Sequence, residues 1–489
     1  MVVGAAAKRA LAAASLGAAL LAASTAFAQV APEPPTAPAA APPPILPAPP
    51  PRPLSVADGQ AIERALRAAP EFPFPPEVEG AAGALASRNP RVRAAADAAL
   101  TRAAEVLAQE ERGIIANPTV VDPDWALRAP YDPMVDFAAA RTAGRIPAWA
   151  AGLARHSPSY VALLADWNRY EAIRAHGGWG ALPEGLTLGP GSKSKETPLV
   201  RARLAAEGYG VTDVTSHVYD RALAAQVADF QTRHALKPSG VLTSQTVQAM
   251  NVPVEARLAT LSANLERERW LPDTMPADRI VADIDAAEVT LFQDDKPALT
   301  MRSIVGDTKH QTPMFASHVS SIEFNPAWHV PTDIAKAELW PKEARSHGYF
   351  AAHGFSVENG QLVQHAGPSS SLGRVKFEMP NPFSVYLHDT PGRALFAVDA
   401  RGRSHGCVRL EKPNDLAVAL LSDQGWTDEK VNDTIAKGDT RWVRPKSMTP
   451  VFLIYRTAEA TDDGPATFRP DLYGWDMKLN AALAPSISR

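Results

Sequence analysis

The chain has 489 residues, enough for two to four domains, and 46% of them are hydrophobic, which is ordinary for globular proteins. A formal net charge of −4 and a pI near 6.3 give no polybasic signature, so nucleic acid is not an expected partner. The single cysteine, Cys407, excludes an intrachain disulfide framework, and 45 unevenly spread prolines help to mark boundaries.

The first 28 residues are typical of a secretory signal peptide. Lys8 and Arg9 form a positive start, residues 10–23 are an Ala/Leu-rich apolar run, and Ala26-Phe27-Ala28 is a cleavage pattern. The run is short and weakly hydrophobic for a membrane-spanning helix, which needs about 20 apolar residues, so an uncleaved anchor is the less favoured alternative. The mature chain is expected to begin near Gln29, where the absence of a cysteine excludes lipid attachment.

A spacer and a helical region are predicted next. Residues 29–54 are so rich in proline that helices and sheets are prevented, which indicates a semi-rigid extended linker. Residues 55–190 place Ala and Leu at helical spacing and predict a helical scaffold domain, with one helix stopping at Gly177-Gly178. Asp166, Arg169 and Glu171 in that helix are interpreted as a solvated face.

Residues 191–256 predict a compact three-helix unit, and a helical connector follows over 257–278. Leu223, Val227 and Phe230 lie on one helix face, and Thr243 fits an N-cap. The unit resembles the small peptidoglycan-binding module, and this resemblance implies glycan binding, although the same helices fit a packing scaffold. The matching residues are Tyr219-Asp220, Val227, Phe230-Gln231, Leu236, Gly240-Val241, Thr246 and Met250-Asn251-Val252.

After residue 279 the hydrophobic period changes from 3.6 to 2, which predicts a mainly-β domain over 279–460. Strands are expected at 279–284, 287–292 and 299–305, with Asp294-Asp295 as a hairpin turn. Further strands are expected within 315–331 and at 360–367, 383–390, 394–400 and 450–458, and one helix is expected at 414–424, after Cys407. Residues 331–374 are expected to form a helical insertion. Residues 461–489 predict a C-terminal helical segment packing on the scaffold. The expected fold class is therefore α+β and multi-domain.

Cys407 is the candidate nucleophile of this β domain. An exported chain that keeps one cysteine favours a thiol retained for chemistry over a buried structural cysteine. The thiolate is the reactive form and needs a nearby base, cation or oriented N–H groups. Its surroundings supply His388, His405 and Gly406, together with Arg403 and Arg409.

His388 is the preferred base. It precedes Cys407 by 19 residues, so the two fall on different elements, and two strand ends can bring an imidazole within reach of a thiol. Neighbouring strand residues point to opposite faces, so a backbone carbonyl is a better orienter of His388 than the Asp389 carboxylate. The same objection applies to His405 as a base. The N–H groups of Gly406 and Cys407 predict an oxyanion hole, where a side chain on residue 406 would block close approach.

His388 followed by Ser404-His405-Gly406-Cys407-Val408-Arg409 resembles the signature of L,D-transpeptidases with a YkuD-type catalytic domain. The runs YLHDTP, FNPAWHVP and FRPDLYGWDMKLNAAL are similar to the large, multi-domain YcbB-like members. The resemblance implies that Cys407 attacks the carbonyl between an L-centred residue, typically meso-diaminopimelate, and the terminal D-Ala of a tetrapeptide stem. A second stem's amine then resolves the thioester into a 3–3 cross-link.

The resemblance further implies peptidoglycan stem peptides as partners, no cofactor, a periplasmic location and carbapenem acylation of the cysteine. Many smaller members have Asn at the position of Arg409, and several large ones have Ser at that of His405. Arg409 fits bidentate binding of a substrate carboxylate, with a structural ion pair as the alternative. Substrate contacts are also predicted for Tyr386, His405, Ser404 and Arg403, and the insertion 331–374 is interpreted as a lid that excludes water.

Other functions stay open at this point. A hydrolase, an L,D-carboxypeptidase or endopeptidase, would use water in place of the amine, and a non-enzymatic wall-binding protein would not need Cys407. A sortase-like enzyme also uses His, Cys and Arg, but SHGC is not its motif. A zinc site is disfavoured because the histidine spacings match no HExxH pattern. The histidines concerned are His347, His353, His365, His388 and His405.

Overall fold

The computed structural model describes residues 52–69, 74–112, 115–127, 133–154, 157–460 and 464–487. The chain divides into two units, residues 1–50 and 51–489, and the second holds every described residue. The predicted signal peptide and all of the predicted linker before residue 52 lie outside the described residues. Within the ranges described, no helix is long and apolar enough to cross a membrane.

The scaffold region begins with a helix that is capped by a side chain at its start. Ser55 caps it, since the Ser55 hydroxyl accepts a hydrogen bond from the Asp58 N–H. Leu66, Leu100 and Ile146 are buried together at the centre of this region. Its helices are α1 (Val56–Ala68), α2 (Ala81–Ala84), α3 (Pro90–Arg112), α4 (Pro133–Thr142) and α5 (Ile146–Ala151), with short 3-10 turns η1 (Pro76–Val78) and η2 (Pro118–Val120).

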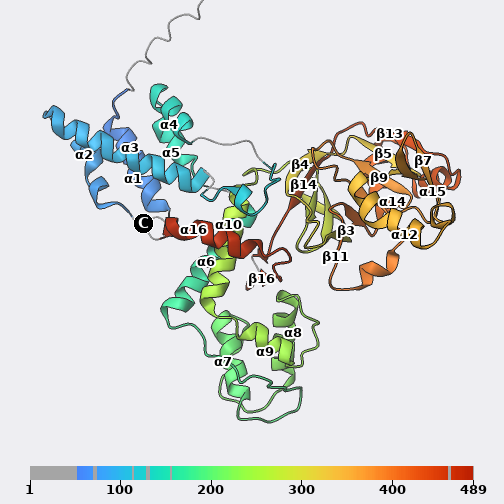
Figure 1. Ribbon diagram of the computed structural model, residues 1–489. Helices are drawn as coiled ribbons and strands as arrows, with labels where there is room; N and C mark the ends of the chain where they lie inside the picture. Colours follow the sequence, from blue (N-terminus) through green and yellow to red (C-terminus); the bar gives the residue numbers. More distant parts are fainter. Residues whose placement is uncertain are drawn as a thin grey trace, which may run out of the picture. The chain divides into compact units, whose positions relative to one another are not determined.

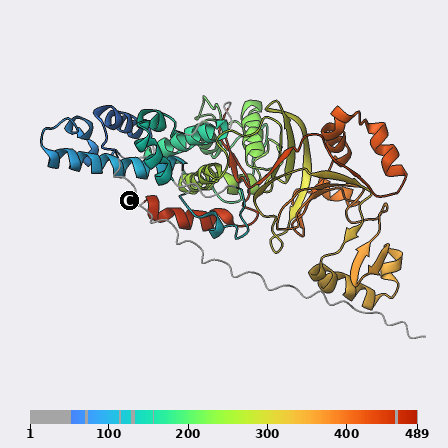
Figure 2. The ribbon, with the colours of Figure 1, turned by 90° about the horizontal axis from the view of Figure 1, so that it is seen from above.

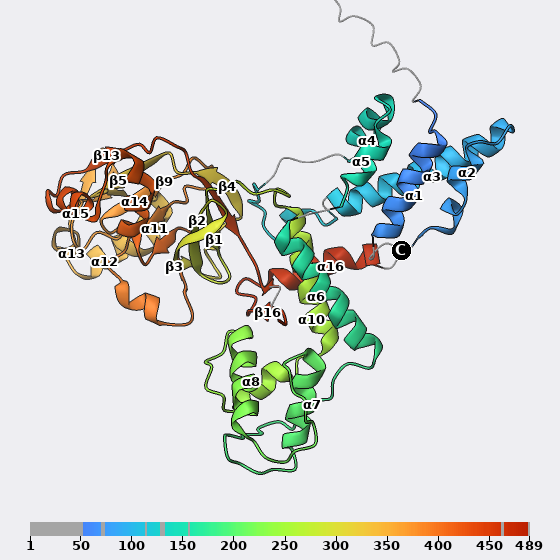
Figure 3. The ribbon, with the colours of Figure 1, turned by 180° about the vertical axis from the view of Figure 1, so that it is seen from behind.

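Two long helices, α6 (Pro158–Ala175) and α10 (Val254–Arg269), pack side by side (Figure 3). As predicted, α6 is followed by Gly177 and Gly178, both of which have positive φ. The prediction that Asp166 lies on a solvated face is wrong. Its side chain is buried and pairs with Arg169 at 2.5 Å, because this face of α6 packs against neighbouring helices.

The three-helix unit consists of α7 (Thr197–Glu207), α8 (Arg221–Arg233) and α9 (Ser244–Met250). Leu223, Val227 and Phe230 are fully buried on one face of α8, as the sequence predicts. The predicted cap is also confirmed, because the Thr243 hydroxyl accepts a hydrogen bond from the Thr246 N–H.

A buried ion pair joins this unit to α6. Arg203 and Glu207 lie 2.7 Å apart with almost no exposure, and the Tyr170 hydroxyl of α6 donates to Glu207 at 2.7 Å. The Arg203 guanidinium also lies 3.7 Å from the centre of the Trp179 ring. Two charges removed from water in this way depend on each other, since either one alone would be uncompensated.

Removing the Glu207 charge should therefore destabilise the protein. We expect Glu207→Gln to lower the free energy of unfolding by about 3 to 5 kcal/mol, because Arg203 stays buried without its partner. Urea denaturation followed by tryptophan fluorescence measures the change. Glu171→Gln is the matched control, since Glu171 pairs with Arg174 at the surface and should leave the midpoint unchanged. Equal midpoints for both variants would contradict the expectation.

The mainly-β region is one sheet of eleven strands among the described residues (Figure 1). In order across the sheet these are β13 (Arg441–Val443), β5 (Ser321–Phe324), β9 (Val375–Glu378), β10 (Leu387–His388), β12 (Val408–Leu410), β3 (Lys296–Gly306), β2 (Glu288–Gln293), β1 (Arg279–Asp283), β14 (Pro450–Ile454) and β4 (Phe315–His318), with β11 (Gly402–Ser404) beside β3. The predicted hairpin turn between β2 and β3 is confirmed, with positive φ at Asp294 and Asp295. β10 with β12, β1 with β14, and β11 with β3 are parallel; the other pairs are antiparallel.

The predicted strand at 394–400 is wrong. Residues Arg393–Ala397 form the 3-10 helix η4, because the turn at Pro391-Gly392 continues and the Leu395 N–H donates to the Gly392 carbonyl. Only Phe396 of this helix is buried. The sequence prediction also missed β9 and β13, and it expected one helix after Cys407 where the structure has α14 (Pro413–Leu421), α15 (Asp428–Ala436) and the short η5 (Ser422–Gln424).

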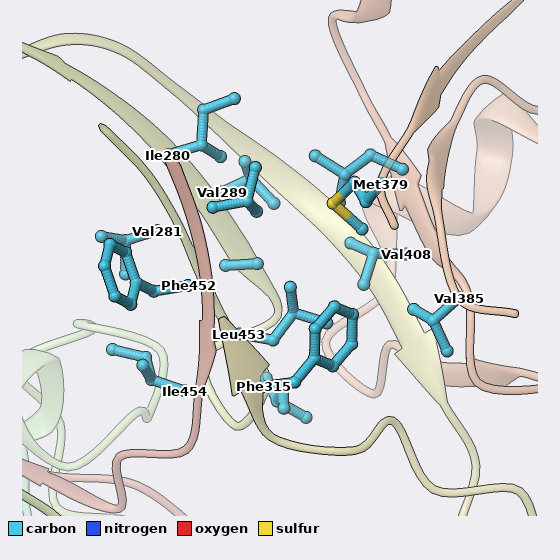
Figure 4. Packing of buried hydrophobic residues seen from close by; sticks show 14 of the residues in the cluster. Ile280, Val281, Val289, Phe315, Met379, Val385, Val408, Phe452, Leu453 and Ile454 are labelled. Carbon is cyan, nitrogen blue, oxygen red and sulfur yellow. The ribbon is translucent and has the colours of Figure 1, made fainter. Parts of the chain in front are cut away.

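The core of the β region takes side chains from both faces of the sheet, because consecutive residues of β1 and β14 are buried in it (Figure 4). Ile280, Val289, Phe315 and Leu453 come from four different strands and are almost completely buried in it. Val408, the residue after the cysteine, belongs to the same cluster with no exposed surface. The core therefore begins one residue away from the candidate nucleophile.

The insertion has a small core of its own, formed by Val330, Leu339, Phe355 and Leu362. Figure 2 shows its short helices and three-stranded sheet as a distinct group. They are β6 (Trp328–His329), α11 (Thr332–Ile334), the π-helix η3 (Ala335–Leu339), α12 (Trp340–Arg345), α13 (Tyr349–Ala352), β7 (Phe355–Glu358) and β8 (Gln361–Gln364).

The C-terminal segment returns to the helical part of the chain. A short pair of strands, β15 (Ala458–Glu459) and β16 (Thr467–Phe468), precedes α16 (Trp475–Ile487). α16 packs against α10 and η2, and Asp476 forms an ion pair with Arg267 of α10 at 2.6 Å. This segment therefore contacts both the connector helix and the scaffold region.

Candidate active site

The neighbouring parallel strands β10 and β12 carry the candidate catalytic residues. Their register pairs Leu387 with Val408 and His388 with Arg409, and the Val408 N–H donates to the Tyr386 carbonyl at 3.1 Å. Leu387 and Val408 are both fully buried in the core. Because side chains alternate along a strand, the four flanking residues point to the other face. These four are Tyr386, His388, Cys407 and Arg409.

The Cys407 thiol is half-buried on this face, and its sulfur lies 3.7 Å from the Ser384 carbonyl oxygen. Burial raises the pKa of the thiol above its ordinary value, while hydrogen bonds to Tyr386 and the charges of Arg409 and Lys376 act in the opposite direction. Burial is the largest effect, since it removes the charged form from water. The resting cysteine is therefore a thiol.

The His388 imidazole is only 4% exposed. Burial and, after it, the Arg409 charge lower the pKa of His388 to about 3, against backbone hydrogen bonds to Asp389 and Leu372 that favour protonation. The ring is therefore neutral at neutral pH. Its Nδ1 has no hydrogen-bond partner among the described residues. A neutral imidazole with an unoccupied nitrogen can accept a proton from a thiol as it attacks a carbonyl.

The Asp389 carboxylate is turned away from this ring, as expected. Its Oδ2 accepts a hydrogen bond from the Arg374 N–H at 2.8 Å, and its Oδ1 lies 3.2 Å from the Arg393 guanidinium. The backbone of Asp389, not its side chain, contacts the His388 ring. The carboxylate thus holds the start of β9 instead of forming a triad.

The turn before Cys407 corrects two sequence predictions. The Ser404 hydroxyl accepts a hydrogen bond from the Gly406 N–H at 3.1 Å and donates to the Cys407 carbonyl at 2.5 Å. Ser404 is 1% exposed, so its prediction as a substrate contact is wrong. Because the Gly406 N–H donates to Ser404 within the turn, the prediction that it is an oxyanion donor is wrong. No described residue accepts a hydrogen bond from the Cys407 N–H, which leaves that group available.

Glycine at 406 has a different cause from the predicted one. Its φ is +105°, a backbone conformation that side chains rarely adopt. A Cβ at this position would meet its nearest neighbour, the Gln311 carbonyl oxygen, at an ordinary 3.5 Å. Backbone conformation and not a lack of space therefore requires glycine here.

His405 contacts the insertion and not the nucleophile. Its Nε2 lies 2.6 Å from Glu338 Oε1 in η3, and the ring centres of His405 and His310 are 4.5 Å apart. Arg403 is exposed, and its side chain donates to the Ala400 carbonyl at 2.8 Å. The structure therefore brings the insertion to the cysteine motif through the His405–Glu338 contact.

Arg409 stands beside the thiol without a carboxylate. None of the ion pairs between described residues includes Arg409, and its Nε has no acceptor among them. The alternative in which Arg409 forms a structural ion pair is therefore wrong. Burial lowers the pKa of this guanidinium, and the neighbouring Cys407 opposes that shift. An anionic group of a substrate would complete this site.

Lys376 of β9 is a site residue that the sequence prediction missed. It pairs with His388 in the strand register, and its Nζ lies 4.3 Å from the centre of the half-buried Tyr386 ring. Glu323 and Glu378 both form ion pairs with it, and burial raises the pKa of Glu323 to about 7. The alternation of Val375, Lys376, Phe377 and Glu378 is the signal that could have located this strand. Within the described ranges no group of three His, Cys, Asp or Glu residues is arranged to hold a metal.

Two family models match this chain. Residues 277–439 match YkuD, described as the L,D-transpeptidase catalytic domain, and residues 193–250 match a model described as "Putative peptidoglycan binding domain". Residues 277–439 are therefore similar to the YkuD catalytic domain. The predicted resemblance and the α+β, multi-domain fold class are thereby confirmed.

Similar proteins carry the same kind of name. A Haemophilus influenzae protein named "Putative L,D-transpeptidase" is 33% identical over 266 residues, which are 49% of this chain and 54% of that protein. The chain thus spans about half the length of this curated relative.

Three solved structures are also similar. An L,D-transpeptidase from Mycobacterium smegmatis has 19% identity and a TM-score of 0.20, covering 36% of this chain and 58% of its own. One from Xylanimonas cellulosilytica has 16% identity and a TM-score of 0.21, covering 56% and 99%. L,D-transpeptidase 3 from Mycobacterium tuberculosis, in complex with a faropenem-derived adduct, has 17% identity and a TM-score of 0.20, covering 37% and 60%.

The electrostatics of the candidate active site predict how the Cys407 thiol responds to pH. Because burial disfavours the thiolate, alkylation of Cys407 by iodoacetamide should require a higher pH in the folded protein than in the urea-unfolded protein. The His388 ring, with a pKa of about 3, should add no step between pH 5 and 8. Mass spectrometry of quenched samples gives the rates. A fast plateau near neutral pH would instead indicate an imidazolium–thiolate pair.

Proposed function

We propose that this protein is a cysteine-dependent L,D-transpeptidase that forms 3–3 cross-links in peptidoglycan through a thioester. The observation that carries the proposal is the pairing of β10 with β12 inside the YkuD domain. The proposal is supported by the register of these strands, in which Cys407 and the neutral, buried His388 flank the paired residues Leu387 and Val408, and by a Cys407 N–H that no described residue accepts. A thiol, a base and an N–H donor are the groups that acyl transfer requires.

In the first half-reaction the Cys407 sulfur attacks the carbonyl that precedes the terminal D-Ala of a tetrapeptide stem. His388 accepts the thiol proton, so a neutral pair becomes charged only as the sulfur–carbon bond forms. The Cys407 N–H donates to the oxygen on which negative charge develops. When the carbon–nitrogen bond breaks, His388 returns the proton to the leaving amine, and D-Ala and a thioester result.

In the second half-reaction an amine of another stem attacks the thioester. His388 takes a proton from this amine and delivers it to the departing sulfur, so the thiol and the neutral imidazole are restored. Arg409 is proposed to bind a stem carboxylate bidentately. The insertion is proposed to exclude water that would otherwise hydrolyse the thioester, and the peptidoglycan-binding domain is proposed to hold glycan strands.

The proposed location is the periplasm, with removal of residues 1–28 on export. If this is right, the protein recovered from the periplasm of a producing Gram-negative host should have Gln29 as its first residue. N-terminal sequencing makes the measurement. A matched version lacking residues 2–28 should stay in the cytoplasm. An intact N-terminus on membrane-bound protein would support the uncleaved anchor.

The reaction itself is tested with tetrapeptide stems and purified variants. Cys407→Ala should abolish 3–3 product, and His388→Gln should lower the rate by roughly 10²–10⁴-fold because the base is lost. His176→Gln is the matched control, since that exposed ring lies at the end of α6, where its Nδ1 contacts the Ala172 carbonyl at 2.7 Å. Liquid chromatography with mass spectrometry quantifies each product.

Comparing the donor stem alone with donor plus acceptor separates the remaining functions. A transpeptidase yields cross-linked dimer when the acceptor is present. A carboxypeptidase releases D-Ala and tripeptide whether or not the acceptor is present. Undiminished 3–3 product from Cys407→Ala would refute the role of the cysteine, and no reaction from any version would leave the non-enzymatic wall-binding function.

A further inference from the structure

A buried hydrogen-bond chain connects the C-terminal segment to the sheet of the YkuD domain. Tyr473 lies in this segment, seven residues after Ala466. Its hydroxyl donates to the Gly306 carbonyl, at the end of β3, at 2.8 Å. The Tyr473 hydroxyl oxygen also accepts a hydrogen bond from the Thr312 N–H at 3.2 Å. Tyr473 is 7% exposed, so water does not compete strongly for these bonds.

Thr312 continues the chain to the cysteine motif. Its hydroxyl accepts a hydrogen bond from the Gly306 N–H at 2.9 Å and donates to the Gly406 carbonyl at 2.8 Å. Thr312 has no exposed surface, and every polar atom in the chain from Tyr473 to Gly406 has a protein partner. The loop residues Gly306 and Thr312 are thus joined to the distant Gly406 and Tyr473 in one network.

The loop between Gly306 and Thr312 is closed tightly. A Cβ on Gly306 would lie 2.0 Å from the His310 carbonyl oxygen, so the loop approaches β3 too closely for any side chain there. The Trp475 indole N–H donates to the Gln311 side chain at 3.1 Å, and the Asp307 N–H donates to the Ser404 carbonyl at 3.0 Å. The loop is therefore held by the C-terminal segment on one side and by the turn at 404–407 on the other.

The Gly406 carbonyl oxygen, which accepts the Thr312 hydrogen bond, belongs to the peptide group that also contains the Cys407 N–H. The Gly406 carbonyl and the Cys407 N–H are the two ends of one planar trans peptide group, and they point in opposite directions. Anchoring the carbonyl therefore sets the direction of the N–H that is the available oxyanion donor. A hydrogen bond to the carbonyl also polarises the amide, which strengthens its N–H as a donor.

We propose that Thr312 and Tyr473 are positioning residues that aim the Cys407 N–H at the developing oxyanion, an inference that rests on the proposed acyl-transfer function. Tyr473 lies outside residues 277–439, the extent of the matched YkuD domain. The C-terminal segment is accordingly part of the catalytic unit, because it supplies the last link of the chain that fixes the oxyanion donor.

The activity test uses full-length Thr312→Val and Tyr473→Phe, each of which removes one hydroxyl. Thioester formation with the tetrapeptide donor should have a kcat lowered by roughly 10- to 100-fold, and a KM unchanged within about twofold, because the donor acts mainly in the transition state. Thr312→Ser keeps the hydroxyl and should restore most of the rate. The double variant should lose no more than the worse single one, since both residues act through one chain.

Matched controls remove hydroxyls elsewhere. Thr434→Val deletes a buried hydroxyl that donates to the Lys430 carbonyl at 2.8 Å within α15, and Tyr160→Phe deletes one that contacts Arg269 at 2.9 Å. Both should keep the wild-type kcat. Far-ultraviolet circular dichroism and the urea midpoint of every variant separate a loss of position from a loss of folded protein.

Hydrogen exchange without any substrate tests the anchoring independently of the reaction. Amides of residues 404–410 should exchange faster in Thr312→Val and Tyr473→Phe than in wild type. Their exchange rates should be the same as in wild type in the two controls. Unchanged exchange in the test variants overturns the proposal, and so does faster exchange with an unchanged kcat. If wild type forms no thioester, the proposed function and the positioning role both fail, while exchange still reports whether the chain holds the turn.

Discussion

The parallel pairing of β10 with β12 is the constraint on which the site depends. Leu387 and Val408 lie opposite each other with no exposed surface, and their burial holds the register of the two strands. A slip of one residue would turn every side chain of the slipped strand to the other face. It would bury Cys407 or His388 in the core in place of its apolar neighbour. The apolar face of the sheet thereby positions the reactive one.

Burial on that reactive face also sets the charge state of the site. It raises the pKa of the Cys407 thiol and lowers that of the His388 ring, so both groups rest neutral. Arg409 and Lys376 supply positive charge nearby, which favours the thiolate once the proton moves. A low resting thiolate fraction also slows oxidation of the cysteine. Burial on this face therefore both limits the reactivity of the resting thiol and keeps His388 neutral as a proton acceptor.

Segments far from the catalytic strands converge on the short turn at 404–407. The insertion reaches it through Glu338 and His405, and the C-terminal segment reaches it through Tyr473 and Thr312. The same C-terminal segment continues into α16, where Asp476 pairs with Arg267 of α10. The C-terminal segment therefore contacts the sheet through Tyr473 and the helical part of the chain through Asp476.

Local patterns in the sequence determined much of this protein, because periodicity and turn chemistry depend on neighbouring residues. They predicted β1 to β3, the turn at Asp294-Asp295, the Thr243 cap, and Cys407 and His388 as the candidate pair. Only the tertiary structure decided that Gly406 N–H is occupied, that Ser404 is internal, and that Thr312, Lys376 and Tyr473 surround the site. A pattern reports which face a side chain takes, whereas its hydrogen-bond partner depends on which distant segment folds against that face.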